Sequence, residues 1–552
     1  MPERAGSPNL ARSPPNALDL SMTHPLPHPE GAGTAVVDDP EPPGMPPPTD
    51  PGQGLDRWTA ACWVLLGLVT TWMLWQVIKF DFRTEPLVGD QASSYMQMLS
   101  LAHDGHDLSF NSLDYAHWEV IEWMRQPYGL YFQAFEGGWA FAKPYGYSLL
   151  LVVPYRVFGF IVGVAFTNAV LLLSLVGVSI AILRLRLRGP AVPLLTGAFV
   201  FASNAYFHAF PVVVDLFLAV LMGACAFLLV FGLKRGHLLA QVAGFGAFAF
   251  LFAEKTTLLV AVGPLAAFCL WQARGWWRRL AMVGGFVVVL GVAVLPYLHY
   301  SDGASWNAYG GERYYGRTGV PFGPDGVGEL NRVDTDETLS IGYIVDSLQT
   351  NIDDAVESAA YYAVGQHTGL LVCFPIALFV MVLALARSIR RWMGHATAQM
   401  TTGADAGRVG DDVAHHGARI VPDGGDGRSI RPEAAAALLG LGLYIALYLV
   451  LFPHNFYGGG QAIGNRYFLQ VSPLVLVVAA GARIPSRQLV GASLAAISVS
   501  LVLWWPHHET PQQALIDQER TTPVQEILPW EGNQSGVNYW ICGFAICDDI
   551  DD

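Results

Sequence analysis

The chain has 552 residues, of which 53% are hydrophobic and 14% are charged. Soluble domains carry about a quarter charged residues, so this composition excludes an ordinary soluble protein and favours a membrane protein. The net charge is −14, and the Lys and Arg residues are spread over many loops rather than massed in one patch, which argues against a nucleic-acid partner.

The first segment, residues 1–55, has 13 prolines among its first 50 positions and no apolar periodicity. Such a segment cannot bury enough apolar surface to offset the loss of chain entropy. It also lacks the basic start and apolar core of a signal peptide. We predict that it is a disordered N-terminal tail on the cytoplasmic side.

Residues 56–505 alternate between apolar stretches and short loops. Because about 20 apolar residues cross the hydrocarbon core, we predict about eleven transmembrane helices and an all-α polytopic membrane fold. The predicted spans are 58–80, 160–183, 191–210, 212–232, 238–253, 256–273, 280–298, 368–386, 434–452, 466–482 and 488–505.

Lys and Arg concentrate in every second loop, which by the positive-inside rule is cytoplasmic. These loops carry Arg184, Arg186 and Arg188; Lys234 and Arg235; Arg274, Arg278 and Arg279; Arg387, Arg390 and Arg391; and Arg483 and Arg487. We therefore predict an inner-membrane protein with a cytoplasmic N-terminus and an extracytoplasmic C-terminal tail, residues 506–552. This membrane topology predicts two large outer loops, about 81–159 and 299–367, and a mobile cytoplasmic linker, about 392–432.

The C-terminal tail contains Cys542 and Cys547. On the outer side a disulfide between them would persist, but spacing alone leaves their pairing open.

The first outer loop begins with Gly89-Asp90-Gln91 and continues as an amphipathic stretch that includes Tyr95. A carboxylate this close to the membrane can act as a general base, hold a cation or cap a helix, and Asp90 alone does not distinguish these roles. His103, His106 and Asp107 follow with the spacing of one helical turn, which suits either a divalent metal or a solvated helix end.

Further polar residues lie near the predicted outer ends of the spans: Lys143, Asp215, Glu254, Lys255, His454, Asn455 and Arg466. Arg466 can grip a phosphate in a bidentate manner or simply reach the interface. Lys255 follows Glu254 directly, so the two charges bind a ligand or anchor a helix end. Asp215 lines a cavity or accepts a hydrogen bond from a neighbouring helix.

Four motifs in chain order resemble those of the GT-C superfamily of integral-membrane glycosyltransferases, over about residues 57–505. They are Gly89-Asp90-Gln91 with Tyr95, Ala102 and Gly105; Lys143-Pro144-Tyr145-Gly146-Tyr147; His367-Thr368-Gly369-Leu370-Leu371; and Asn455 to Pro473 with Gly458-Gly459-Gly460, Gly464 and Arg466-Tyr467. Gln91 departs from the pattern, because the family commonly has an acid there.

The resemblance implies an enzyme that moves a sugar from a polyprenyl-phosphate carrier to an extracytoplasmic lipid, polysaccharide or protein acceptor. It implies Asp90 as the general base of an inverting displacement. It also implies that Lys143, Lys255 and Arg466 hold the donor phosphate, whose departure needs cations more than a general acid. Tyr95, Asp215, Glu254, His454 and Asn455 would then line the substrate cavity.

Three questions stay open from the sequence. The first is whether the protein is a transferase or a non-catalytic membrane protein such as a lipid-linked sugar flippase or a polymerase-like protein. A flippase should depend on charges along the path across the bilayer, and a transferase on Asp90 and the outer rim. The second is the identity of the sugar and the acceptor. The third is the metal requirement and the oligomeric state. A sensor protein is disfavoured, because the sequence predicts no folded output domain in the cytoplasmic loops.

Overall fold

The computed structural model describes residues 56–80, 90–103, 108–110, 130–135, 138–301, 303, 305–309, 312–316, 330–333, 352–366, 368–405, 430–453, 464–503 and 528. They belong to one unit of the chain, Leu55–Asp552, and the other unit is Met1–Gly54. The predictions for the tail at 1–55 and for Cys542 and Cys547 therefore lie outside the described residues.

Six of the described helices are long and apolar enough to cross a membrane. They are α1 (Arg57–Lys79), α5 (Phe160–Arg184), α7 (Asp215–Arg235), α10 (Trp276–Tyr300), α15 (Pro432–Leu451) and α18 (Ser486–Leu503). A helix satisfies its own backbone hydrogen bonds, as the bilayer core demands, and α1 also exposes large apolar side chains such as Leu68 and Trp75. The chain is an integral membrane protein.

Four further apolar helices are shorter: α4 (Gly146–Phe158), α6 (Ala191–Val200), α8 (Leu238–Glu254) and α9 (Leu258–Gln272). Three predicted spans are interrupted. The span at 191–210 is helical only as α6 and as the 3-10 turn η2 (Phe207–Ala209), and the span at 466–482 divides into α16 (Arg466–Val471) and α17 (Pro473–Gly481). The span at 368–386 divides at Phe374 into two helices. The count of eleven spans is not confirmed.

Helices α12 (Ile352–Val364), α13 (Leu370–Cys373) and α14 (Pro375–Asp405) complete the described helices beyond the first outer loop. Helix α14 continues to Asp405, so the segment predicted as a mobile linker from about 392 is helical over its first part. Proline inside a helix breaks it, and residues 376–405 contain no proline, which is consistent with the extension of α14 to Asp405.

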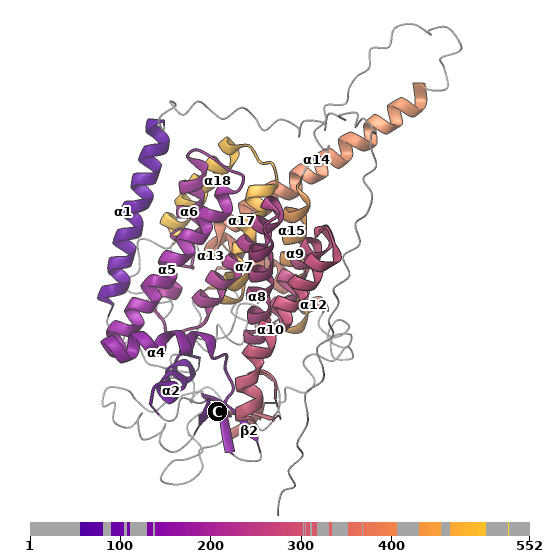
Figure 1. Cartoon of the computed structure of the whole chain (residues 1–552). Helices are drawn as coiled ribbons and strands as arrows, with labels where there is room; N and C mark the ends of the chain where they lie inside the picture. Colours follow the sequence, from indigo (N-terminus) through magenta and orange to yellow (C-terminus); the bar gives the residue numbers. More distant parts are fainter. Residues whose placement is uncertain are drawn as a thin grey trace, which may run out of the picture. The chain divides into compact units, whose positions relative to one another are not determined.

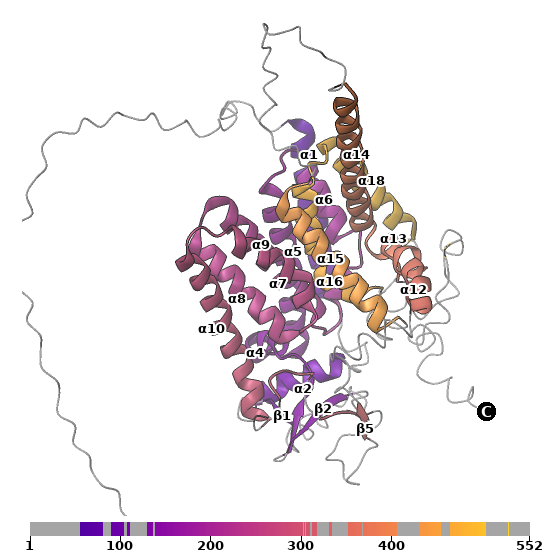
Figure 2. The ribbon, with the colours of Figure 1, turned by 90° about the vertical axis from the view of Figure 1, so that its right-hand side faces the viewer.

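Helix α7 packs against α5, α8, α9, α16 and α17 inside the bundle, and Figures 1 and 2 show the long helices running in similar directions. Helix α15 approaches α9 closely at Gly440, where an added Cβ would lie 2.0 Å from the carbonyl oxygen of Ala261. Only glycine allows this contact between the two backbones.

A five-stranded antiparallel sheet lies at one end of the bundle, in the order β1-β3-β2-β4-β5. Its strands are β1 (Ser109–Phe110), β2 (Leu130–Phe135), β3 (Gly138–Phe141), β4 (Glu312–Gly316) and β5 (Leu330–Val333). The pairing of β2 with β4, with Phe132 opposite Tyr314, joins the two loops predicted to be extracytoplasmic. The all-α prediction holds for the spans and missed this sheet.

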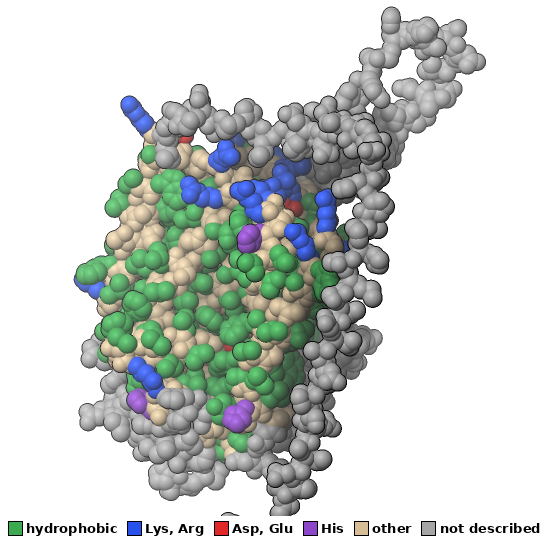
Figure 3. All heavy atoms as spheres, viewed as in Figure 1, with side chains coloured by type: hydrophobic (Ala, Val, Ile, Leu, Met, Phe, Trp, Pro, Cys, Tyr) green, Lys and Arg blue, Asp and Glu red, His purple; other side chains and the backbone are tan. Residues whose placement is uncertain are grey.

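The opposite end of the bundle carries most of the Lys and Arg side chains visible in Figure 3, whereas β2 and α2 (Asp90–His103) lie at the sheet end in Figure 1. The two ends therefore differ in charge as the positive-inside pattern predicts. Which end faces the cytoplasm stays a prediction.

Candidate functional site

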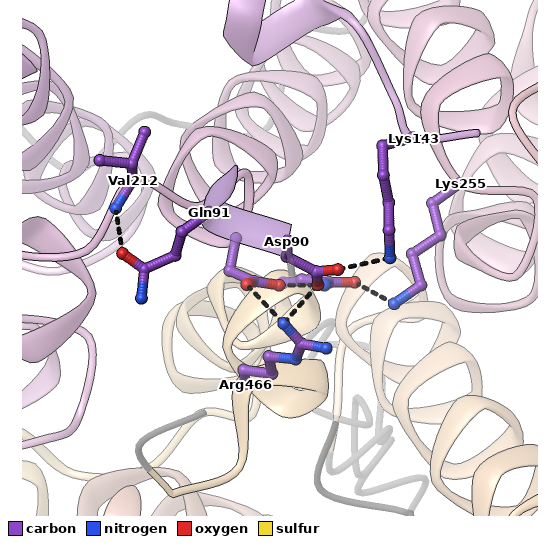
Figure 4. A network of polar contacts seen from close by, with 8 residues as sticks. Asp90, Gln91, Lys143, Val212, Lys255 and Arg466 are labelled. Carbon is purple, nitrogen blue, oxygen red and sulfur yellow. Dashed lines mark hydrogen bonds and ion pairs between the residues drawn. The ribbon is translucent and has the colours of Figure 1, made fainter. Parts of the chain in front are cut away.

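Asp90 is the first residue of α2, and two cations from distant parts of the chain contact its carboxylate. Lys143 forms an ion pair with Oδ1, and Arg466 Nη1 lies 2.6 Å from Oδ2. Figure 4 shows the two basic side chains reaching Asp90 from different elements, with Asp90 between them. All three side chains are at most 22% exposed, so the contacts are shielded from solvent.

Lys143 lies in the short connection between β3 and α4, and its backbone is fixed on both sides. Its carbonyl accepts a hydrogen bond of 3.1 Å from Gln97 Nε2. Three residues later, the N–H of Gly146 donates to both carboxylate oxygens of Glu254 at 3.1 Å. Glu254 thus caps the N-terminus of α4, where the helix dipole favours an anion. Glu254, which was predicted to line the substrate cavity, thus helps to hold the segment that carries Lys143.

Arg466 owes its position to the two residues before it. Gly464 has a φ of +62°, and a Cβ there would lie 2.6 Å from both Asn204 and Cys373. Asn465 then caps α16 by accepting a hydrogen bond of 3.0 Å from the N–H of Phe468. The left-handed glycine and the Asn cap together start α16 at Arg466, with its guanidinium next to Asp90.

A second carboxylate lies on the other side of Arg466. Asp215 is the first residue of α7 and is 2% exposed, and its Oδ2 lies 3.9 Å from Arg466 Nη1. Its Oδ1 accepts a hydrogen bond from the amide of Gln470, whose Oε1 accepts one of 3.0 Å from Lys255 Nζ. A continuous chain of polar contacts therefore runs from Lys143 to Lys255.

Lys255 sits in the turn between α8 and α9 and is buried under two tyrosines. Its ammonium lies 3.7 Å from the ring centre of Tyr467 and 5.5 Å from that of Tyr448. Within the described part of the chain no carboxylate forms an ion pair with it. The aromatic faces stabilise the charge without neutralising it.

Arg313, on β4, brings the sheet to the same site. Its guanidinium lies 5.2 Å from the ring centres of both Tyr131 and Tyr309, and Lys143 lies 4.1 Å from the same Tyr131 ring. Arg313 also donates a hydrogen bond of 3.3 Å to the carbonyl of Ala142. One tyrosine thus contacts two cations.

We call six residues the charged cluster: Asp90, Lys143, Asp215, Lys255, Arg313 and Arg466. Among the described residues four basic side chains face two carboxylates, so with Lys255 protonated the charged cluster has an excess of two positive charges in a poorly hydrated place. Such an excess is costly unless an anion joins it, because buried charges need partners. The arrangement is therefore suited to binding a phosphate.

The charged cluster also changes the pKa values of its members outside the spans. Burial alone would raise the pKa of Asp90, but Lys143 and Arg466 outweigh burial and hold it well below its usual range. Burial lowers the pKa of Lys143, against the opposing effect of Asp90. Burial likewise lowers the pKa of Lys255 to about 7, with Asp215 acting in the opposite direction. Asp90 is therefore ionised at neutral pH.

Two other residues of the first outer loop, Gln91 and Tyr95, point away from the charged cluster or pack in the core. Gln91, which stands where the resembling family commonly has an acid, accepts a hydrogen bond of 3.4 Å from the N–H of Val212 and points away from the cations (Figure 4). Tyr95, predicted to line the cavity, is buried with its ring against Phe160 at 4.4 Å between centroids. The predicted cavity residues His454 and Asn455 lie outside the described residues.

The metal hypothesis receives no structural test. His103 is described, and its Nε2 lies 2.9 Å from the hydroxyl of Tyr155, whereas His106 and Asp107 lie outside the described residues. Within the described ranges, no group of three or more His, Cys, Asp or Glu side chains is placed to hold a metal.

The sequence did not single out Gln470 or Arg313 as a member of the site. The one signal for Gln470 is its spacing of four residues from Arg466, which puts both on the same face of α16. Arg313 had no such signal, because its place depends on the pairing of β4 with β2.

Two crystal structures of ArnT from Cupriavidus metallidurans are similar to this chain. The complex with undecaprenyl phosphate has 16% sequence identity and a TM-score of 0.40, over 80% of this chain and 63% of ArnT. The apo structure has 17% identity and a TM-score of 0.37, over 78% of this chain and 62% of ArnT. The chain thus spans less than two thirds of the ArnT chains that it matches.

No family model matches the chain, and no curated protein matches it. We therefore infer function from the residues of the site.

Proposed function

We propose that the protein is a membrane glycosyltransferase that transfers a sugar from a polyprenyl-phosphate donor to an extracytoplasmic acceptor. The observation that carries this proposal is the charged cluster, in which an ionised carboxylate contacts two partly buried cations, with two buried cations nearby, at one end of a bundle of membrane helices. A lipid phosphate reaches such a place from the bilayer, with its tail among the apolar helices. The proposal puts this end on the outer face of the inner membrane.

The excess positive charge supports transfer more than binding alone. A sugar joined through a phosphodiester carries one negative charge, and the polyprenyl phosphate that leaves carries up to two, because its second pKa is about 6. Negative charge therefore grows on the phosphate as the glycosidic bond breaks. Lys143, Lys255 and Arg466 are already in place to stabilise it, which lowers the barrier without a general acid.

Asp90 is the group that can accept the proton. In a single displacement the acceptor oxygen forms a bond to the anomeric carbon, the bond from that carbon to the phosphate oxygen breaks, and the hydroxyl proton moves to Asp90. The configuration at the anomeric carbon inverts. With both cations on it Asp90 is a weak base, and a donor phosphate that draws Lys143 and Arg466 toward itself strengthens it.

The test uses purified protein in nanodiscs with a panel of radiolabelled polyprenyl-phosphate sugars and candidate acceptors. We expect loss of sugar from the lipid with the wild type and none with Asp90→Asn, while lipid binding persists in both. Binding without turnover across the panel would instead favour a flippase. Turnover that survives the substitution would support the transferase and show that Asp90 is not its general base.

A further inference from the structure

Gln470 lies between the side chains of Lys255 and Asp215, which carry opposite charges. Its Oε1 accepts a hydrogen bond of 3.0 Å from Lys255 Nζ, and its Nε2 donates one to Asp215 Oδ1. The side chain is 2% exposed, as are Asp215 at 2% and Lys255 at 8%. The three residues come from α16, α7 and the turn after α8.

The chemistry of the partners fixes the orientation of this amide. An ammonium only donates hydrogen bonds and a carboxylate only accepts them, so the amide oxygen must face Lys255 and the amide nitrogen must face Asp215. The amide satisfies both charged groups and neutralises neither. A direct ion pair between Lys255 and Asp215 would cancel the positive charge, and in this poorly hydrated place the attraction between them is strong.

Two neighbours support the same division of charge. Arg466, one helical turn before Gln470, lies 3.9 Å from the other oxygen of Asp215, so α16 supplies a hydrogen bond to Oδ1 and a longer ion pair to Oδ2, which accepts no hydrogen bond among the described residues. Tyr467 lies against the Lys255 ammonium at 3.7 Å from its ring centre, and its aromatic face is a neutral partner for that charge. Lys255 is left as a buried cation whose polar partners are neutral.

We propose that Gln470 is a positioning residue that separates Lys255 from Asp215 and so keeps the Lys255 ammonium available to the phosphate of the lipid donor. This role rests on the proposed function. It predicts that Gln470 and Lys255 act on phosphate binding as one unit.

A double-mutant cycle on the full-length protein in nanodiscs tests this coupling, with the dissociation constant for a polyprenyl phosphate as the readout. Gln470→Met keeps the size of the side chain and removes both hydrogen bonds. We expect Gln470→Met and Lys255→Met each to weaken binding about tenfold, and the double variant to be no weaker than Lys255→Met alone. The matched control is Gln241→Met, at a buried glutamine on α8 outside the charged cluster, which should bind like the wild type.

The outcomes separate the two proposals. Wild-type protein that binds no polyprenyl phosphate overturns the proposed function and this role with it. Wild-type binding with an unaffected Gln470→Met overturns only the role of Gln470. Losses that multiply in the double variant, to about a hundredfold, show that Gln470 acts through packing and also overturn it. If Gln470→Met does not fold, Gln470→Asn takes its place, because its shorter amide cannot span both partners and should give the same coupling.

Discussion

Asp90→Asn should tighten the binding of the lipid phosphate while it abolishes turnover. Asp90 carries a negative charge inside the proposed phosphate site and is in contact with both Lys143 and Arg466. The substitution keeps the shape, removes the repulsion and frees both cations for the ligand. A residue that only organised the site would give the opposite sign, so the direction of the change separates the two roles.

The size of the effect follows from the geometry. Arg466 Nη1 lies 2.6 Å from the Asp90 carboxylate, so a phosphate on the same group lies within about 6 Å of Asp90. At an effective dielectric constant of about 20, two unit charges at that separation repel each other by about 3 kcal/mol. Rearrangement of the side chains and screening leave about 1 to 2 kcal/mol, which is roughly a five- to thirtyfold lower dissociation constant.

The assay is calorimetric titration of a polyprenyl phosphate, which carries no sugar and cannot react, into wild type and Asp90→Asn in nanodiscs. Binding of inorganic phosphate under the same conditions reports whether the headgroup alone is enough. A dissociation constant that rises tenfold in Asp90→Asn would refute the reasoning, because it would show that Asp90 holds the cations in place rather than competing for them.

Three further predictions follow from the same contacts. Arg466→Lys should lower kcat/KM by at least tenfold, because an ammonium lacks the planar fork of donors with which a guanidinium can hold a carboxylate and a phosphate together, and steady-state kinetics on the lipid donor measures it. Wild-type affinity for the polyprenyl phosphate should fall as the pH rises through about 7, where Lys255 loses its proton and its charge, and titrations from pH 6 to 9 should become flatter in Lys255→Met. Gly146→Ala should lower the thermal midpoint, because its Cβ would lie 2.9 Å from the Glu254 carboxylate, whereas Gly284→Ala, with nothing within 4 Å, should leave the midpoint unchanged. Equal thermal midpoints in the two glycine variants would contradict the steric explanation at Gly146.

The long spans were predictable because they depend on local composition alone. The ranges predicted for α1 and α5 agree with the helices to within one residue at each end. The broken spans were not predictable in this way. Helix α16 ends at Val471 and Pro473 starts a new helix, and a hydropathy average over the whole span does not register such a break.

The residues of the site were partly predictable from charge. The sequence singled out Asp90, Lys143, Lys255 and Arg466 because basic and acidic residues are unusual near the outer ends of spans, and the structure brings all four into the charged cluster. Sequence could not show their neighbours, because Gln470 is an ordinary glutamine by composition. It also could not show the sheet, since its strands are short and the pairing of β2 with β4, which joins the two halves, crosses more than 170 residues of sequence.

The charged cluster lies where helices begin. Asp90 and Asp215 are the first residues of α2 and α7, and Gly146 begins α4 three residues after Lys143. Helix N-termini present unpaired N–H groups and the positive end of the helix dipole, so both carboxylates are stabilised there before any cation is counted. The same ends favour a phosphate, and in the proposed reaction the proton taken up by Asp90 would remove a negative charge and make the site still more favourable for an anion. That explains how a base and an anion can share one small space. The helix ends and the cations favour both, and only the repulsion between the two has to be overcome when the donor binds.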